Sequence, residues 1–312
     1  MTAPPPASAD RPARSLASGA WRPAPSGAGP VVRAAWVVVV LVGTAPAIVW
    51  DQLTGAVPSW LPVAQAGLLA LALLAPAWWP VLRPLRRFTV IIAAMLALLT
   101  WVPRFGANRP VFGGSAFDVR MQAEQTGRLV VALAMIGVLF LLGYRRRDFF
   151  LTVGDLRAPI RPVRFLGFPG RDPWWKFGLI WSGGIAAALG VALYLSDPPG
   201  GGLATLVGLL PSVLIYAALN AFTEEMTYRA PMLAGLEPAV GSNQALWLAA
   251  VFFGIAHYFG TPGGLIGAAL SVFMGWILGK AMIETRGLFW PWWIHFLSDT
   301  VIFTFVALSL VG

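Results

Sequence analysis

The sequence predicts an all-α, polytopic membrane protein, a transmembrane helical bundle of about eight or nine spans. Two observations predict this fold. Of the 312 residues, 58% are hydrophobic and only 11% are charged, whereas a soluble domain carries about 25% charged residues. Uncharged runs close to the roughly 20 apolar residues that cross a bilayer also recur from Ala34 to the C-terminus.

The first residues differ from the rest. Residues 1–30 are rich in Pro, Ala, Ser and Gly and contain no apolar run, so we expect a disordered N-terminal tail. The segment also lacks the compact apolar stretch of a cleaved signal peptide. Residues 31–312 are expected to form a single membrane domain.

Nine candidate spans follow in chain order, and because the third and fourth are short, eight spans is an alternative. They are residues 34–50, 60–79, 88–103, 129–143, 177–195, 203–235, 243–259, 263–283 and 288–310. The loop of residues 145–176 is expected to lie at the interface, with Trp174 and Trp175 at headgroup level.

The basic residues favour one orientation. With a cytoplasmic N-terminus and nine crossings, 18 of the 22 lysines and arginines fall on the cytoplasmic side, as the positive-inside rule expects. The other four, expected in one outer loop, are Arg104, Arg109, Arg120 and Arg128. The C-terminus is then outside.

The net charge of +9 comes from these short loops, where topology and anionic lipid explain it better than nucleic acid does. Nucleic acid is therefore not an expected partner. The use of Arg over Lys, 20 against two, with much Ala, Gly and Pro, is typical of a GC-rich bacterial genome. We expect a multi-pass protein of a bacterial cell membrane.

Ionisable residues within spans are costly and usually functional, and here they occur in three motifs. The sixth span contains NAFTEEMTYR, which ends at Arg229; the seventh contains FFGIAH, which ends at His257; the ninth contains HFLSD, which begins at His295. These motifs hold both histidines of the chain. Cysteine is absent, which excludes thiol nucleophiles and cysteine-ligated zinc.

Helical spacing organises the motifs. Residues four apart share a face, which pairs Glu225 with Arg229 and His295 with Asp299. Glu224 and Glu225 point about 100° apart, so they are expected to have different roles. Arg229 is expected to neutralise Glu225 and to leave Glu224 free for chemistry.

Depth brings the motifs together. Counted at about 1.5 Å per residue from the expected cytoplasmic helix ends, the three motifs agree in depth to within about two turns. We therefore expect Glu224, His257, His295 and Asp299 to meet in one buried site. Each motif alone has a structural interpretation, as a local ion pair or an interhelical hydrogen bond. If all three structural interpretations held, both histidines and the buried acids would lie at one depth without a shared function, which we consider improbable.

The order Glu-Glu-x-x-x-Arg, Phe-x-x-x-His and His-x-x-x-Asn/Asp on successive C-terminal helices resembles the CPBP family. This family comprises the type II CAAX prenyl endopeptidases and the bacterial Abi, or bacteriocin-processing, proteins. The matching region is residues 203–305. The resemblance implies a helical membrane domain whose active site opens toward the cytoplasm and a water molecule that hydrolyses a peptide bond.

The resemblance also implies roles. Glu224 corresponds to the catalytic glutamate, and His257 helps it to hold and deprotonate water. His295 and Asp299 correspond to the pair that contacts the oxyanion. Eukaryotic CAAX enzymes have Asn at the position of Asp299; because an ionised Asp repels an oxyanion, Asp299 is expected instead to orient His295 and keep it protonated. The supporting positions are Glu225 and Arg229.

These residue types suit hydrolysis independently of the family resemblance. A carboxylate can act as a general base, and a protonated histidine can donate to an oxyanion. A zinc mechanism stays open, because His257, His295 and Glu224 would satisfy the metal. We favour no cofactor, since the chain has no His-Glu-x-x-His helix. The enzyme is thus expected to be an intramembrane endopeptidase of glutamic or metallo type.

Two rival functions stay open. A non-catalytic membrane immunity or scaffold protein has the same fold, because fold does not guarantee activity. A proton-coupled transporter also uses buried Glu and His, as a proton relay. For the protease, the expected partners are a peptide or membrane-protein substrate and the lipid bilayer.

Overall fold

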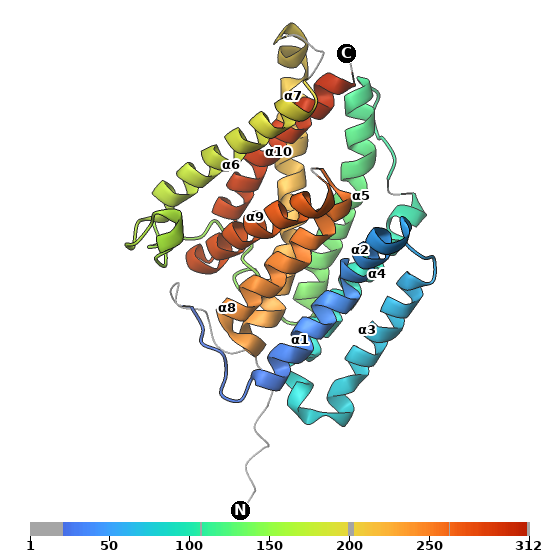
Figure 1. The fold of residues 1–312 in the computed structure, drawn as a ribbon, viewed down its shortest axis with the longest axis vertical. Helices are drawn as coiled ribbons and strands as arrows, with labels where there is room; N and C mark the ends of the chain where they lie inside the picture. Colours follow the sequence, from blue (N-terminus) through green and yellow to red (C-terminus); the bar gives the residue numbers. More distant parts are fainter. Residues whose placement is uncertain (1–20, 107, 199–202, 262, 311–312) are drawn as a thin grey trace, which may run out of the picture.

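The computed structural model describes residues 21–106, 108–198, 203–261 and 263–310. The regular secondary structure of this part of the chain is helical (Figure 1). The β pairing recorded within the described residues is confined to isolated bridges, Pro159 with Pro173 and Val163 with Phe168. The predicted all-α helical bundle is therefore confirmed.

The first predicted span is broken into two helices that meet at 46°. Pro46 has no N–H to donate to the carbonyl of Val42, which interrupts the helical ladder. Gln65 compensates, because its side-chain amide donates to the carbonyl oxygens of Val42 (3.3 Å) and Gly43 (2.7 Å). The N-terminal helices are α1 (Gly29–Val42), α2 (Ala45–Thr54), α3 (Leu61–Trp78) and α4 (Arg86–Trp101), with 3-10 turns η1 (Pro80–Leu85) and η2 (Pro103–Phe105).

α5 (Ala116–Leu141) begins well before its predicted start. A capping box initiates it: the Ser115 hydroxyl accepts from the backbone N–H of Asp118 (3.1 Å), and the Asp118 carboxylate accepts from the backbone N–H of Ser115 (3.2 Å). The prediction that Arg120 and Arg128 lie in an outer loop is therefore wrong, because both are on this helix.

The loop between α5 and α6 (Trp174–Ser196) is held to the protein by Trp174. The indole of Trp174 is fully buried and donates to Glu284 (2.9 Å), whereas Trp175 is 49% exposed. Trp174 therefore faces the protein interior, where its N–H is bound to a buried carboxylate, and Trp175 is the exposed ring of the pair. A short 3-10 turn in this loop is η3 (Arg164–Leu166).

The next segment doubles back on itself. It consists of α7 (Leu203–Glu224), the π-helical turn η4 (Glu225–Arg229), α8 (Ala230–Ala256) and the 3-10 turn η5 (His257–Phe259). Gly241 has φ 78° and ψ 163°, a conformation open essentially to glycine alone. The Arg229 guanidinium lies 4.4 Å from the ring centre of Phe253, although the intervening residues would span about 36 Å in a straight helix. The chain therefore reverses at Gly241.

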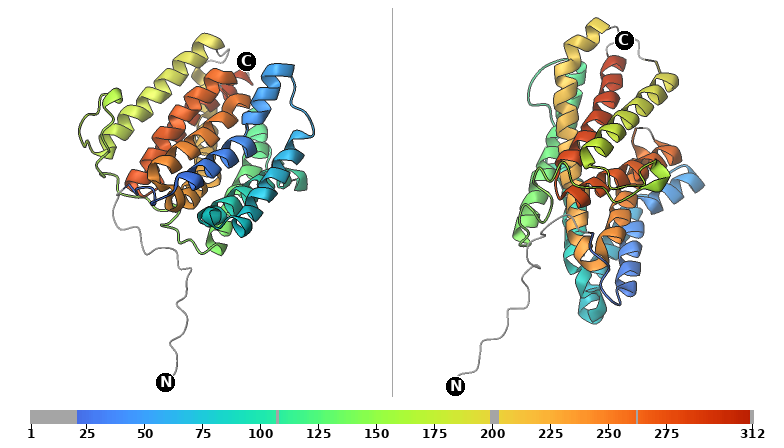
Figure 2. Two further views of the ribbon diagram at one scale, coloured as in Figure 1. Left: turned by 60° about the horizontal axis from the view of Figure 1, so that its bottom comes forward. Right: turned by 90° about the vertical axis from the view of Figure 1, so that its left-hand side faces the viewer.

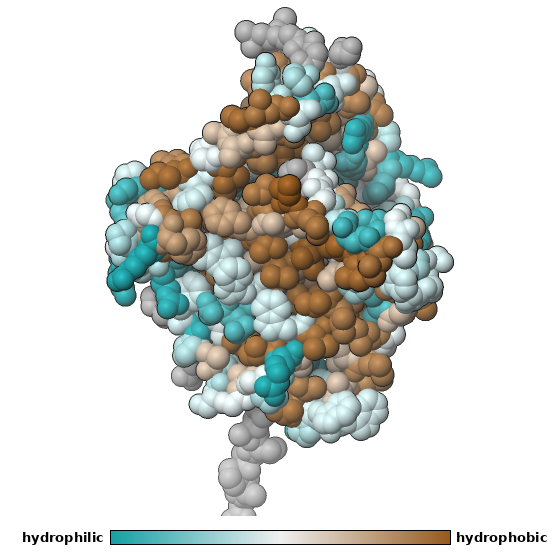
Figure 3. Space-filling view, viewed as in Figure 1, coloured by the Kyte–Doolittle hydropathy of each residue, from teal (hydrophilic) through white to brown (hydrophobic). Residues whose placement is uncertain are grey.

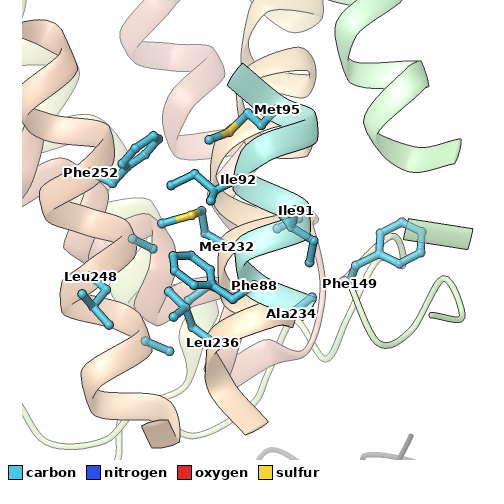
Figure 4. Packing of buried hydrophobic residues seen from close by; sticks show 14 of the residues in the cluster. Phe88, Ile91, Ile92, Met95, Phe149, Met232, Ala234, Leu236, Leu248 and Phe252 are labelled. Atoms are coloured by element: carbon cyan, nitrogen blue, oxygen red, sulfur yellow. The ribbon is translucent and has the colours of Figure 1, made fainter. Parts of the chain in front are cut away.

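α9 (Gly264–Thr285) and α10 (Phe289–Ser309) complete the bundle. α9 packs along α8, and α10 packs against α6, α7 and α9 (Figure 2). The largest buried apolar cluster joins α4 to α8 and includes Phe88, Ile91, Ile92, Met232, Leu236 and Phe252 (Figure 4).

Seven helical segments of the described chain are long and apolar enough to cross a membrane, or up to eight if α1 and α2 form one broken span. One of the seven, Thr205–Phe259, contains the reversal at Gly241. Its two arms correspond to the sixth and seventh predicted spans. Apolar residues cover the middle of the face seen in Figure 3. Together with the candidate spans, this makes the chain a multi-pass membrane protein.

Packing reaches into the segment that the sequence assigned to the disordered tail. Residues 1–20 lie outside the described residues, but Trp21 donates from its indole to Glu284 (3.0 Å). The backbone N–H of Arg22 donates to the Ser242 hydroxyl (2.8 Å), and the Ser242 N–H donates to the Arg22 carbonyl (3.0 Å). The composition of the segment concealed these anchors, which pack Trp21 and Arg22 against α8 and α9.

Candidate active site

A buried ion pair lies where α7 meets α8. Glu225 and Arg229, on the turn η4, are both fully buried and are joined by an ion pair and hydrogen bond. This is the pair that four-residue spacing predicted. Arg229 also stacks over Phe253 of the returning arm. A π-helical turn inside a helix often accompanies a functional site.

Glu224 is the last residue of α7 and lies beside this pair. Its side chain is 13% exposed, against 7% for Asp299 and 4% for His295. One carboxylate oxygen, Oε1, accepts from Arg128 (2.9 Å) and Asn220 (3.4 Å). The other, Oε2, lies 3.6 Å from His295 Nε2. Glu224 is thus held by Arg128, a cation that the sequence did not assign to the site.

His295 of α10 faces three carboxylates. Its Nδ1 lies 2.9 Å from Glu225 Oε1, and its Nε2 lies 3.6 Å from both Glu224 Oε2 and Asp299 Oδ2. A carboxylate accepts hydrogen bonds, so Nδ1–H donates to Glu225. Glu225 therefore orients the ring at Nδ1, the role that the comparison with the CAAX enzymes led us to expect for Asp299. The reason is that η4 packs across from α10, and contacts between helices are not visible in sequence spacing.

Asn220 links Asp299 to the rest of the site. Its side-chain amide donates to Asp299 Oδ2 (2.9 Å), and its carbonyl oxygen accepts from Gln125 (2.9 Å) and Arg128 (2.5 Å). These bonds join α5, α7 and α10 in one network. Four-residue spacing places Asn220 on the helix face of Glu224, but the sequence indicated none of these contacts with α5 and α10.

His257 lies at the start of η5, next to this network. Its Nδ1–H donates to the carbonyl oxygen of Phe253 (2.9 Å), which can only accept. The lone pair of the neutral ring is then on Nε2. The Phe253 ring contacts both histidines, with ring centres 4.4 Å from His257 and 6.0 Å from His295. Phe253 therefore brings His257 to the same site.

The turn that carries His257 is tied to α2. The Tyr258 hydroxyl donates to Asp51 Oδ2 (2.5 Å) and accepts from the Gln52 side chain. These bonds join α2 to the turn that carries His257, the last residue of the second motif. Tyr258 is thus a candidate for positioning the neighbouring histidine.

The sequence missed Arg128 and Gln125 as members of the site. The predicted fourth span began after both of them, because the polar first half of α5 did not look like a membrane helix. One signal was available: Ser115 and Asp118 have the spacing of a capping box. A helix starting there places Arg128 more than three turns inside it, at about 3.6 residues per turn.

The possible zinc ligands do not form a set in the described residues. No group of three or more His, Asp or Glu side chains is arranged there to hold a metal ion. Of His257, His295 and Glu224, an ion-pair contact joins the last two. Arg128 places positive charge on Glu224 Oε1, which opposes a bound cation. This arrangement does not fit a zinc site.

The comparisons agree with the motif order. Residues 206–301 match the family described as type II CAAX prenyl endopeptidase Rce1-like, and this range contains all three motifs. No curated protein and no solved structure gave a match. The family match confirms the resemblance on which the sequence analysis relied. The chain is a multi-pass membrane protein, and its residues 206–301 are similar to this CAAX protease family.

Proposed function

We propose that this protein is an intramembrane endopeptidase in which Glu224 activates the water that hydrolyses a peptide bond. One observation carries the proposal. The carboxylates of Glu224 and Asp299 both lie beside the His295 ring, each with an oxygen 3.6 Å from His295 Nε2. Ionisable groups buried at membrane depth are costly and are retained for function. The family match to the same segment supports hydrolysis over other uses.

Glu224 is the general base in this proposal. Its Oε1 is held by Arg128, which leaves Oε2 to take a proton from water. The water oxygen then bonds to the carbonyl carbon of the substrate, and the carbonyl electron pair moves onto its oxygen. When the C–N bond breaks, Glu224 returns the proton to the leaving nitrogen.

His295 is the donor to the developing oxyanion. A protonated ring balances the charge of the cluster, in which three carboxylates meet two guanidinium groups. With Nδ1–H bound to Glu225, the N–H at Nε2 is directed to the gap beside Glu224. The carboxylates are Glu224, Glu225 and Asp299, and the guanidinium groups are those of Arg128 and Arg229.

His257 assists the base. Its Nδ1–H is committed to the Phe253 carbonyl, so Nε2 is an acceptor that can hold the attacking water against Glu224. Asp299 lies next to the oxyanion donor, and the Asn220 amide bound to it partly offsets its negative charge. The two histidines thus have different tasks.

The site is proposed to open toward the cytoplasm in a bacterial cell membrane, with a cytoplasmic N-terminus. In Figure 1, α1 begins at the lower end of the molecule and α10 ends at the upper end, which an odd number of crossings requires. A topology reporter in the 145–173 loop should report the cytoplasm, and one after α10 should report the outside. The same side for both would contradict this orientation.

The test of the function compares membrane peptides by mass spectrometry in cells that express wild type, Glu224→Gln or Glu124→Gln. Glu124 is a matched control, because it is an exposed acid on α5 paired with Arg120. Fragments produced by wild type and Glu124→Gln should be absent with Glu224→Gln. Identical peptides in all three would favour the scaffold interpretation, and substrate flux into proteoliposomes without cleavage would favour a transporter.

A further inference from the structure

A second site lies outside the cluster around Glu224. A cavity of about 390 Å³ opens where the N-terminal segment crosses the reversal of α8, and Arg161 of the loop before α6 also lines it. Its lining includes Trp21, Arg22, Arg161, Asn243 and Gln244. The volume falls in the range of small-ligand sites, about 300–1,000 Å³.

The cavity is basic without compensation. Two arginines, Arg22 and Arg161, line it, and no acidic residue does. No ion pair within the described residues involves either guanidinium group. Asn243 adds a side-chain amide to the wall. Arginine and amide N–H groups are the donors that bind a phosphate group.

The walls of the cavity are held in place. The Arg161 guanidinium lies 4.6 Å from the ring centre of Trp21, and the Trp21 indole N–H is bound to buried Glu284. At Gly241, an added Cβ would lie 2.6 Å from the backbone nitrogen of Ala24, so the turn packs directly on the N-terminal segment. The two arginines are therefore presented by a rigid frame.

The cavity lies at the ends of spans. The segment before α1, the reversal between the two arms of α8 and the loop before α6 all meet there, and Figure 1 shows the first two at the lower end of the bundle. Basic pockets at helix ends on the cytoplasmic side of a membrane are suited to anionic lipid headgroups. We propose that this cavity binds the phosphate of an anionic lipid headgroup.

The test measures lipid binding to the purified full chain by native mass spectrometry, with phosphatidylglycerol and phosphatidylcholine as probes. Arg22→Gln/Arg161→Gln should weaken phosphatidylglycerol binding by about fivefold for each arginine removed and leave phosphatidylcholine binding unchanged. The hydrogen bonds of Arg22 to Ser242 and of Arg161 to Glu284 use main-chain atoms, so both anchors survive the substitution.

The matched control is Arg83→Gln/Arg164→Gln, which removes the same charge from two exposed arginines outside the cavity. This variant should bind phosphatidylglycerol as wild type does, and equal loss in both double variants would overturn the proposal. Titration with inorganic phosphate separates the sources: millimolar phosphate should not displace the lipid. If inorganic phosphate displaced the lipid at concentrations similar to those at which the lipid itself binds, the assignment to a lipid headgroup would be overturned. If the cavity variant has a lowered unfolding temperature, the single variant Arg22→Gln is compared with Arg83→Gln instead. Weaker phosphatidylglycerol binding by Arg22→Gln than by Arg83→Gln supports the proposal, and equal binding overturns it.

Discussion

Two buried charge clusters in this bundle differ in how completely their polar atoms are bonded. In the cluster on α9, Glu284 Oε1 accepts from Lys280 (2.5 Å) and Trp21 (3.0 Å), and Oε2 accepts from Trp174 (2.9 Å). Lys280 also donates to the carbonyl of Arg161 (3.0 Å). Acid and base are matched one to one, and each has protein partners.

The cluster around His295 is less complete. In the described part of the chain, Glu225 Oε2 and two guanidinium nitrogens of Arg229 have no hydrogen-bond partner. His295 Nε2 stands 3.6 Å from two carboxylate oxygens, beyond the usual hydrogen-bond distance of about 2.7–3.2 Å.

The difference separates a structural cluster from a candidate catalytic one. Bonds that are already complete hold segments together, and the Glu284 cluster joins the N-terminal segment, the loop before α6 and α9. Buried polar atoms with incomplete bonding need a reason, and a reacting group is one such reason. Substitutions in the cluster around His295 should therefore lower activity per folded molecule, whereas substitutions in the Glu284 cluster should lower stability alone.

The largest effect on stability is expected for Lys280→Met, which leaves Glu284 without its cation. Removing one partner of a buried ion pair lowers the free energy of unfolding by about 3–5 kcal/mol. The matched control is Lys176→Met, which breaks the exposed pair with Asp172 and should cost at most about 1 kcal/mol. Unfolding in detergent measures both, and similar losses would contradict a structural role for the buried cluster.

Arg229→Leu should destabilise the protein by a similar amount, since Glu225 loses its partner. Activity per folded molecule should also fall, because Glu225 orients His295. Lys280→Met should keep its activity per folded molecule. The comparison fails if the two variants, normalised for folded protein by gel filtration, cleave at the same rate.

A smaller effect, on activity alone, is expected for Arg128→Gln. Arg128 holds Glu224 Oε1 (2.9 Å) but its side chain is 44% exposed, so its loss should spare the fold. A hydrogen bond to a charged group contributes about 1.5–3 kcal/mol, so cleavage should slow about 10- to 100-fold. Arg120→Gln on the same helix is the control and should cleave like wild type. Equal rates for the two variants would remove Arg128 from the site.

The smallest effect is expected for Tyr258→Phe, which removes the bond to Asp51 (2.5 Å) that ties η5 to α2. The bond acts on His257 only indirectly, through η5, so we expect a loss of about 0.5–1.5 kcal/mol in transition-state stabilisation. Cleavage should then slow by about two- to tenfold through a less well placed His257. Tyr194→Phe, at an exposed position on α6, should have no effect. A rate for Tyr258→Phe within error of the Tyr194→Phe rate would show that the tie does not position the histidine.

The sequence predicted the bundle because runs of about 20 apolar residues mark most of the segments that cross a bilayer. It missed the start of α5, since a polar half-helix looks like a loop until its cap is recognised. It also missed the packing of Trp21, because an anchor made by one indole does not change the composition of its segment.

Within the site, spacing along one helix was informative and contacts between helices were not. The pair of Glu225 with Arg229 follows from four-residue spacing. The contacts of His295 with Glu225 and of Glu224 with Arg128 cross between helices. Their geometry depends on the reversal at Gly241 and on the start of α5, neither of which a periodicity reveals.

The most direct test of the account is the rate at which purified, chelator-treated protein cleaves one membrane peptide identified in the cellular comparison. Wild type should keep its activity, and Glu224→Gln should lose about 10²- to 10⁴-fold, the usual effect of removing a general base. Activity that chelation abolishes and zinc restores would replace the metal-free mechanism with a zinc-dependent one. A Glu224→Gln rate equal to that of wild type would contradict the central claim that Glu224 activates the water.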